Sequence, residues 1–313
     1  MTTGDLSSIH VAAAADSHGE LPLAVMLDGL LRQMSPGRVV TLHVLDGGCD
    51  RVAIERVVGG RATVVWHDLA AAAGPIAGLP TVRHIPPISY ARLLLPDVLS
   101  ELDRVLYLDA DMVIKADIAE LWDTGTDSKA IAAVADPGMP TLGDDGCVGY
   151  ASDELTNPAA RPFNAGVMLM DLTCWRTQRF AERVIDFLRR HLSRLNWADQ
   201  DGLNVVLQGD WAERNLEWNV PIPLLHGEEE RDLTAVEPFD TDPPFGVPAI
   251  YHLFGGHKPW NSGPSHTFRA AWLEELRASR YVAPERWSAW RRRDDRRARM
   301  FSLRKRLRRF LPG

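Results

Sequence analysis

Two carboxylates stand one residue apart at the end of an apolar run. Asp109 and Asp111 follow residues 105–108, Val-Leu-Tyr-Leu, a sequence typical of a buried strand. In open α/β sheets the carboxyl ends of the strands open onto the ligand crevice, so we expect both carboxylates to be displayed there. Such a pair suits a hard divalent cation that also takes the oxygens of a diphosphate. An Asp-x-Asp pattern alone is as often a solvated loop, and the apolar run before it favours the functional interpretation.

A second candidate begins at His252, which leaves another apolar run and enters the glycine-rich turn of residues 252–260, His-Leu-Phe-Gly-Gly-His-Lys-Pro-Trp. Glycines let backbone amides approach a phosphate, and Lys258 can neutralise its charge. A histidine after a strand is by itself more often a structural residue. Together with Asp109 and Asp111, however, its imidazole completes a mixed ligand set that indicates Mn²⁺ or Mg²⁺, and the nitrogen ligand favours Mn²⁺.

Three further positions have two interpretations each. Asn164 stands where a long loop re-enters an apolar run, and its amide suits either a sugar hydroxyl or a turn. Asp199 and Gln200 follow Trp197, where Asp199 serves either a site or the N-cap of a helix over 200–207. Asp16, at the end of the first apolar run, is either a crevice residue or a cap for the helix that follows.

An alternation of apolar runs and helical patterns predicts the elements that position these side chains. We expect strands at 9–16, 39–45, 62–69, 104–108, 130–135 and 165–172, a last apolar run at 249–254, and helices at 20–34 and 175–195. The second helix has one apolar stripe, formed by Phe180, Val184, Phe187, Leu188 and Leu192. Residues 136–162 form a long loop, and residues 221–248 are irregular and acidic. This rhythm predicts a parallel-rich α/β sheet wrapped by helices.

Length and composition limit the class of protein. The chain has 313 residues, 45% hydrophobic and 25% charged, which fits one large globular domain with or without an appendage. Three widely spaced cysteines make neither a disulfide framework nor a zinc cluster, which suggests a reducing compartment. The first eight residues lack the features of a signal peptide, and no stretch of about 18 apolar residues occurs. We expect a cytoplasmic protein without membrane spans.

Charge is divided unevenly along the chain. Residues 286–310 contain 12 Arg or Lys and two Asp, whereas the remainder has 23 basic and 40 acidic residues. The acidic body argues against a nucleic-acid partner. Apolar residues punctuate the basic tail, the last four at helical spacing: Trp287, Trp290, Met300, Leu303, Leu307 and Phe310. This suits an amphipathic helix on an anionic membrane, at the inner face; the alternative is a solvated helix folded onto the acidic body.

Several motifs occur together in one order along the chain. They are Ala14-Ala15-Asp16, Tyr90-Ala91-Arg92-Leu93, Leu108-Asp109-Ala110-Asp111, Phe163-Asn164-Ala165-Gly166, and Asp199-Gln200-Asp201 followed by His252, Gly255 and Lys258-Pro259-Trp260. Together they resemble glycosyltransferase family 8, and within it most closely the bacterial lipooligosaccharide α-1,4-galactosyltransferase. The resemblance extends from about residue 9 to residue 260. The loop from residue 136 to 163 and the stretch 221–248 do not match, so acceptor identity is not implied.

The resemblance implies a GT-A fold, a Rossmann-like nucleotide-diphospho-sugar transferase, over residues 1–263, followed by a helical, basic appendage over 264–313. It implies a retaining transfer from a UDP-hexose, UDP-galactose or UDP-glucose, with Mn²⁺ as cofactor and Mg²⁺ as the alternative. The acceptor would be a carbohydrate or a lipid-linked glycan, as in lipopolysaccharide or other glycan synthesis.

The resemblance also assigns roles to residues. Asp109, Asp111 and His252 would hold the metal, while the nucleotide and diphosphate would lie against Ala14, Asp16, His18, Ala110, Gly255 and Lys258. His18 stands where close relatives have Asn near the ribose. The donor hexose would be surrounded by Asp109 and the catalytic candidates Arg92, Asn164, Asp199 and Gln200. The acceptor would be received by Val82, His84, Trp197 and Phe254.

Two other functions fit parts of the sequence. A non-catalytic descendant could bind a UDP-sugar without transferring it, although the intact metal and hexose residues argue against this. A haloacid-dehalogenase-type phosphatase also uses a strand followed by Asp-x-Asp, but near its N-terminus, whereas Asp109 and Asp111 come after about a hundred residues. The absence of Gly-x-Gly-x-x-Gly after the first strand disfavours a nicotinamide enzyme.

Overall fold

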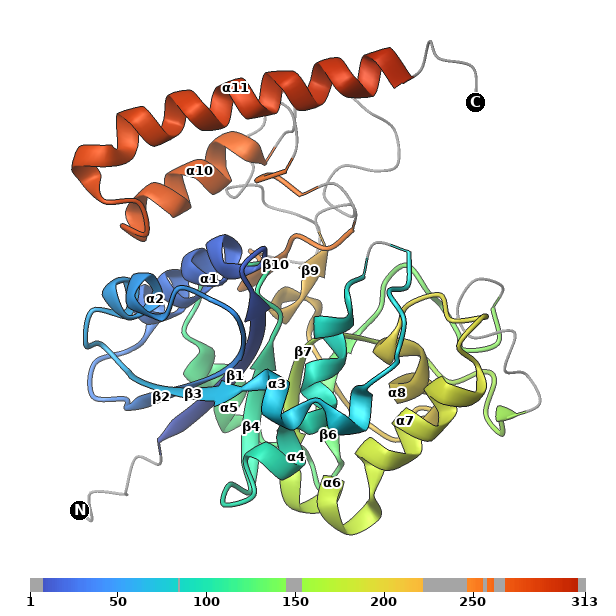
Figure 1. The fold of residues 1–313 in the computed structure, drawn as a ribbon. Helices are drawn as coiled ribbons and strands as arrows, with labels where there is room; N and C mark the ends of the chain where they lie inside the picture. The colour runs from blue at the N-terminus through green and yellow to red at the C-terminus, as the bar shows by residue number, and fades with distance from the viewer. Residues whose placement is uncertain are drawn as a thin grey trace.

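A seven-stranded sheet forms the centre of the chain (Figure 1). The computed structural model describes residues 8–83, 85–144, 154–221, 247–255, 258–261 and 268–308. The strands lie in the order β3-β2-β1-β4-β7-β6-β8, and β7 runs antiparallel to both of its neighbours while the other pairs are parallel. Their bounds are β1 Ile9–Asp16, β2 Val40–Gly47, β3 Thr63–Asp68, β4 Arg104–Leu108, β6 Ile131–Ala135, β7 Phe163–Asp171 and β8 Ala212–Arg214. The parallel-rich α/β sheet is thus confirmed.

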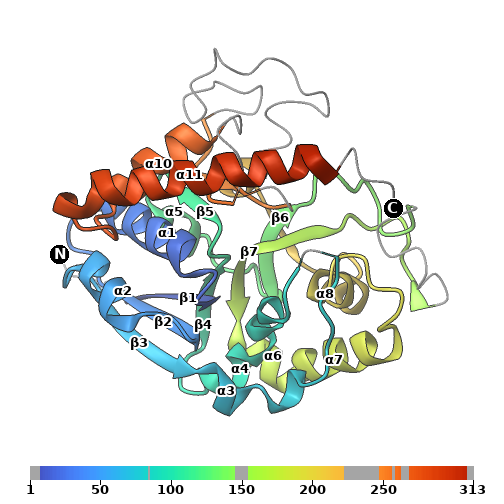
Figure 2. The same cartoon turned by 45° about the horizontal axis from the view of Figure 1, so that its top comes forward.

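Helices cover both faces of this sheet: successive side chains of a strand point to opposite faces, and in the central strands β1, β4 and β7 almost all of them are buried. In β1, Val11 and Ala13 pack with α1 (Glu20–Gln33), α2 (Arg51–Val58) and α5 (Ile118–Asp123). Ala12 and Ala14 point to the opposite face. That face is covered by η2 (Pro87–Leu94), α4 (Leu95–Val98), α6 (Leu172–Gln178), α7 (Phe180–Arg190) and α8 (Asp199–Leu207). Figure 2 shows α1 and α2 on one side of the sheet and α6, α7 and α8 grouped together away from them.

A second sheet of three short strands stands next to the first, in the order β5-β10-β9. It consists of β5 (Met112–Ile114), β9 (Val220–Pro221) and β10 (Ile250–His252). Antiparallel pairing of β5 with β10 places His252 opposite Met112, and the amide of Leu253 donates to the carbonyl of Asp111 at 2.9 Å. This small sheet therefore carries the last predicted apolar run back to the end of β4.

The C-terminal helices α10 (Arg269–Ala278) and α11 (Pro284–Arg308) pack together on the side of α1 (Figures 1 and 2). Arg269, 3% exposed, donates to the carbonyl of Pro259 at 2.9 Å and pairs with Asp294 of α11. Trp287 and Trp290 stack on each other and pack against the cluster of Tyr251, Leu253, Trp272, Leu273 and Leu276. These tryptophans therefore pack on the body of the protein. Within the described residues, none of the helices combines the length and apolar composition that crossing a bilayer requires.

One predicted helix is wrong. The pattern over 175–195 belongs to two helices, α6 and α7, separated by Arg179 in the left-handed conformation (φ 52°). A left-handed residue ends a helix because its backbone turns the chain out of the helical path, and periodicity does not reveal a one-residue break. Four residues of the stripe are buried as expected, but Leu192 lies beyond α7 and is 43% exposed.

The remaining expected elements are confirmed with end residues that differ by at most two, apart from the last apolar run, of which only 250–252 form a strand. In its described parts, 136–144 and 154–162, the predicted loop contains turns and no strand. Most of the acidic stretch 221–248 lies outside the described residues. The division at residue 263 also stays a prediction.

Candidate active site

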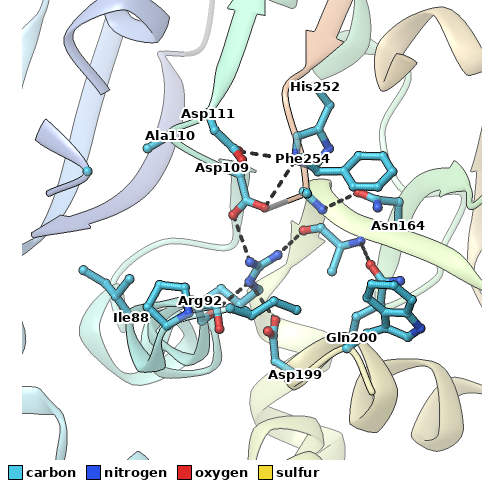
Figure 3. A pocket seen from close by; sticks show the side chains of 18 of the residues that line it. Ile88, Arg92, Asp109, Ala110, Asp111, Asn164, Asp199, Gln200, His252 and Phe254 are labelled. Carbon is cyan, nitrogen blue, oxygen red and sulfur yellow. Dashed lines mark hydrogen bonds and ion pairs between the residues drawn. The ribbon is translucent and has the colours of Figure 1, made fainter. Parts of the chain in front are cut away.

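A cavity of about 770 Å³ lies where β1 and β4 end. Because these two strands are parallel neighbours, their carboxyl ends meet at one edge, and Asp16 and Asp109 both line the cavity there. Asp109 and Asp111 occupy the turn between β4 and β5, while His252 ends β10. In Figure 3 the side chains of these last three residues point toward one another at one end of the cavity.

The cluster of Asp109, Asp111 and His252 has the composition of a metal site. One ligand atom from each lies within 4.8 Å of the other two. His252 Nε2 is 3.3 Å from Asp111 Oδ1 and 3.8 Å from Asp109 Oδ2. Two carboxylates and one imidazole fit Mn²⁺ or Mg²⁺, and the remaining coordination positions would face the cavity.

Asp111 is held ionised by its neighbours. Burial alone would raise the pKa of its carboxyl, but the ammonium group of Lys258, together with the imidazole of His252 when that ring is protonated, more than offsets this and lowers the pKa well below the usual range. The ammonium group of Lys258 contacts Asp111 Oδ2 and donates to the carbonyl of Leu253 at 2.7 Å. The ionised carboxylate is the form that binds a cation, so a lowered pKa favours the metal site.

Arg92 joins the metal side of the cavity to α8. It is 4% exposed, and its Nη2 donates to Asp109 Oδ1 at 2.8 Å. Its Nε lies 2.8 Å from Asp199 Oδ2 but directs its hydrogen to the carbonyl of Ser89, so the contact with Asp199 is an ion pair without a well-aligned hydrogen bond. Burial would lower the pKa of Arg92, yet Asp109 and Asp199 raise it above its usual value. One guanidinium therefore fixes two carboxylates from different elements.

Asp199 titrates far from its ordinary range. It is 2% exposed, and burial raises the pKa of its carboxyl to about 6 even though Arg92 acts in the opposite direction. The alternative interpretation of Asp199 as an N-cap is wrong, because Ala198 is the cap residue of α8. The carboxylate that accepts the loop amides is Asp201, bonded to the N–H groups of Asn196 at 2.6 Å and Trp197 at 2.9 Å.

Replacing Asp199 by Asn is expected to make the stability of the protein less dependent on pH. The folded pKa of about 6 exceeds the ordinary value of 3.8, so the folded state binds this proton more tightly. The stability that the protonated group contributes is therefore present below pH 3.8 and is lost as the pH rises through about 6. Asparagine imitates the protonated form at every pH. The melting temperature of Asp199→Asn relative to wild type should thus increase between pH 4.5 and pH 7.5.

The matched control for this measurement is Asp97→Asn, at an exposed carboxylate on α4. Its melting temperature should follow that of the wild type at every pH. If the difference in melting temperature between Asp199→Asn and wild type stayed constant from pH 4.5 to pH 7.5, the raised pKa of Asp199 would be contradicted.

Two side-chain amides lie on the wall formed by β7 and α8, and a buried carboxylate holds both. Gln200 Nε2 and Asn164 Nδ2 lie 3.2 and 3.4 Å from Asp136 Oδ2. Gln200 Oε1 accepts from the backbone N–H of Ala165 at 3.0 Å, which fixes the side chain against β7. Figure 3 shows Asn164, Gln200 and Arg92 around the same space. Such donors and acceptors can bind the hydroxyls of a sugar.

Behind the metal cluster, His252 rests on Gly166 and Asn219. A Cβ atom built on Gly166 would lie 2.3 Å from His252 Cε1, so glycine is required for the imidazole to occupy this position. His252 Nδ1 is 2.9 Å from Asn219 Oδ1, and Asn219 Nδ2 donates to Asn164 Oδ1 at 3.0 Å. Neither contact has a local signature in the sequence, because the partners lie in different elements.

The structure brings most of the predicted site residues together. Those that line the cavity are Ala14, Asp16, His18, Arg92, Asp109, Ala110, Asp111, Asn164, Trp197, Asp199, Gln200, His252, Phe254, Gly255 and Lys258. Asp16 is a cavity residue and not the cap of α1, whose cap residue is Gly19; its Oδ1 accepts from the amides of His18 and Gly19 in the turn before the helix. Val82 does not line the cavity: it is buried and bridges to Ile85. His84 lies outside the described residues. Tyr107 and Asp136 also line the cavity and were not predicted.

Comparison with known proteins gives consistent matches. A family model described as Glycosyl transferase family 8 matches residues 75–263. General stress protein A of Bacillus subtilis strain 168 is 28% identical over 297 residues, which are 90% of this chain and 95% of that protein. The lipopolysaccharide 1,3-galactosyltransferase of Salmonella typhimurium strain LT2 is 30% identical over 190 residues, 60% of this chain. The chain covers 53% of the length of that relative.

The fold also has a counterpart among solved structures. The galactosyltransferase LgtC, in complex with donor and acceptor sugar analogues, aligns with a TM-score of 0.69 at 24% identity, over 89% of this chain and 99% of that chain. At this identity the likeness shows the fold, and the predicted GT-A architecture is confirmed.

Proposed function

The chain belongs to glycosyltransferase family 8, and we propose that it transfers a hexose from UDP-galactose or UDP-glucose to a carbohydrate or other hydroxyl acceptor, with retention of anomeric configuration. The observation that carries this proposal is the convergence of Asp109, Asp111 and His252 within 4.8 Å at one end of a large cavity. Family membership excludes the phosphatase and nicotinamide interpretations.

The metal cluster and Lys258 would face the diphosphate of the donor. Asp109, Asp111 and His252 would hold Mn²⁺, or Mg²⁺, which supplies Lewis-acid neutralisation of the diphosphate when bound. As the bond to the anomeric carbon breaks, negative charge would grow on the UDP oxygen, and the ammonium group of Lys258, which contacts Asp111 beside the cavity, would stabilise it. Asp16, His18 and Gly255 line the same cavity and would bind the nucleotide.

The opposite wall would hold the hexose. Arg92 fixes the carboxylates of Asp109 and Asp199, while Asn164 and Gln200 present amide groups to the space between them. Retention requires either a covalent intermediate or departure and attack on the same face. Gln200 is a weak nucleophile, and its Oε1 is engaged by the N–H of Ala165. We therefore favour same-face attack, with Gln200 and Asp199 stabilising the positively charged sugar. A covalent adduct trapped on either residue would contradict this.

UDP release from a panel of UDP-hexoses, in Mn²⁺ or EDTA, tests the proposal. Wild type should release UDP from one donor in Mn²⁺, and Asp109→Ala should lose this activity. Release in EDTA at the same rate would contradict the metal assignment. Calorimetric UDP binding without release from any donor, with or without saccharide acceptors, would instead favour the non-catalytic UDP-sugar-binding function.

The basic helix α11 is the proposed contact with anionic lipid, which would bring the enzyme to a lipid-linked acceptor at the inner membrane face. Arg292, Arg293, Arg296, Arg297 and Arg299 are exposed on it, and Met300 is 52% exposed. Deleting residues 291–313 should abolish co-sedimentation with phosphatidylserine liposomes. Undiminished co-sedimentation of the truncated protein would contradict the membrane role. A cooperative melting transition of the truncated protein is the control that it is folded.

A further inference from the structure

The buried amide of Asn219 lies between the metal cluster and the sugar wall of the cavity. Asn219 is 2% exposed and directly precedes β9, whose pairing with β10 brings it beside His252. Its Oδ1 is 2.9 Å from His252 Nδ1, and its Nδ2 is 3.0 Å from Asn164 Oδ1. Neither Oδ1 nor Nδ2 of Asn219 faces the cavity, so any effect of Asn219 on the site must act through His252 and Asn164.

The direction of this hydrogen-bond chain is fixed by a backbone amide. Gly166 N–H can only donate, and its partner at 3.0 Å is Asn164 Oδ1. Because that oxygen accepts, Asn219 must donate to it through Nδ2 and present Oδ1 to His252. An oxygen acceptor at Nδ1 requires that Nδ1 carry the hydrogen. The neutral imidazole is therefore protonated on Nδ1 and has its lone pair on Nε2.

This tautomer points a lone pair at two carboxylates. His252 Nε2 faces Asp111 Oδ1 at 3.3 Å and Asp109 Oδ2 at 3.8 Å, so three electron-pair donors converge. We propose that Asn219 is the positioning residue of the metal site. It holds His252 in the tautomer that binds a cation, and it orients Asn164 on the sugar wall. The inference rests on the proposed function in taking this cluster as the metal site.

Two variants separate the two contacts of Asn219. Asn219→Leu has a similar volume but removes both hydrogen bonds. In Asn219→Asp a carboxylate oxygen can still accept from His252 Nδ1–H, whereas its other oxygen faces Asn164 Oδ1 and repels it. Asn215→Leu and Asn215→Asp are matched controls at an exposed position of the same segment.

The tautomer can be read directly by nitrogen NMR of histidine-labelled protein at pH 8, with His252→Gln to assign the signals. Wild type and Asn219→Asp should show Nδ1–H and an unprotonated Nε2, whereas Asn219→Leu should lose this preference. Calorimetric titration with Mn²⁺ alone should give a Kd for Asn219→Leu raised about 10- to 100-fold. The Kd of Asn219→Asp should stay within about threefold of wild type, although its UDP release falls with the displaced Asn164.

If Asn219 had only a structural role, both variants would lose Mn²⁺ affinity and UDP release in proportion to their loss of melting temperature. The proposal would be overturned by an Nε2–H tautomer in wild type, by unchanged tautomer and Mn²⁺ affinity in Asn219→Leu, or by equal losses in the two variants. Failure of the transferase proposal is distinguishable, because it would appear as no UDP release from any donor while the tautomer and Mn²⁺ results hold.

Discussion

Asp111→Asn is expected to lower kcat/KM for Mn²⁺-dependent UDP release by about 100-fold or more. The substitution keeps the size of the side chain and removes the charge that the ammonium group of Lys258 holds in place. It therefore takes away a proposed metal ligand and leaves the Lys258 ammonium group without its carboxylate. Both changes act where negative charge would develop on the leaving group. Rates over a range of Mn²⁺ concentrations would separate weaker metal binding from slower turnover.

Asp97→Asn is the control for general effects of losing an acidic side chain, and its rates should equal those of wild type. Asp111→Asn should also unfold in a cooperative thermal transition, which shows that the variant is folded. If the folded variant released UDP within a few-fold of the wild-type rate, with unchanged Mn²⁺ dependence, the assignment of Asp111 would be wrong.

Gly166→Ala adds one methyl group and is expected to lower UDP release as much as Asp111→Asn does. Its Cβ would lie 2.3 Å from His252 Cε1 and 2.8 Å from Nδ1, far inside van der Waals contact. The ring has little room to retreat, because it is 3% exposed and bonded to Asn219. Forcing a methyl group into a packed site typically costs about 1–3 kcal/mol of folding free energy. Displacing His252 should also lower UDP release by about 100-fold, as loss of a metal ligand does.

Urea unfolding and UDP release, measured on the same preparations, test this prediction. Gly74→Ala is the matched control, since a Cβ there meets no atom within 4 Å, and it should change neither measurement. Wild-type release from Gly166→Ala, at an unaltered free energy of unfolding, would show that His252 does not need this position.

The parts of the site that could be predicted from the sequence are those with local signatures. Asp109 and Asp111 follow an apolar strand, and His252 leaves another, so strand ends alone place them at one edge of a sheet. Asn219 could not be found in this way. Its partners His252 and Asn164 lie 33 and 55 residues away, on β10 and β7, and the packing of the two sheets brings all three together.

The fold shows the same limit. Strands β1 and β4 were predicted with their ends correct because their apolar runs are five to eight residues long. Strands β5 and β9 have three and two residues, too few for any periodic pattern. The sequence does not predict the break at Arg179, because an arginine in the left-handed conformation has no local sequence signal and the apolar pattern continues across it.

The contact between Arg269 and the carbonyl of Pro259 connects α11 to the cavity. Pro259 follows Lys258, whose ammonium group contacts Asp111, and Asp294 of α11 holds Arg269 from the other side. We therefore expect a displacement of α11 to shift the segment proposed to face the diphosphate. Thermodynamic reciprocity then relates the two events: any surface that binds α11 more tightly when a donor is present must tighten donor binding by the same factor. Binding of α11 to that surface and binding of the donor would then be thermodynamically coupled.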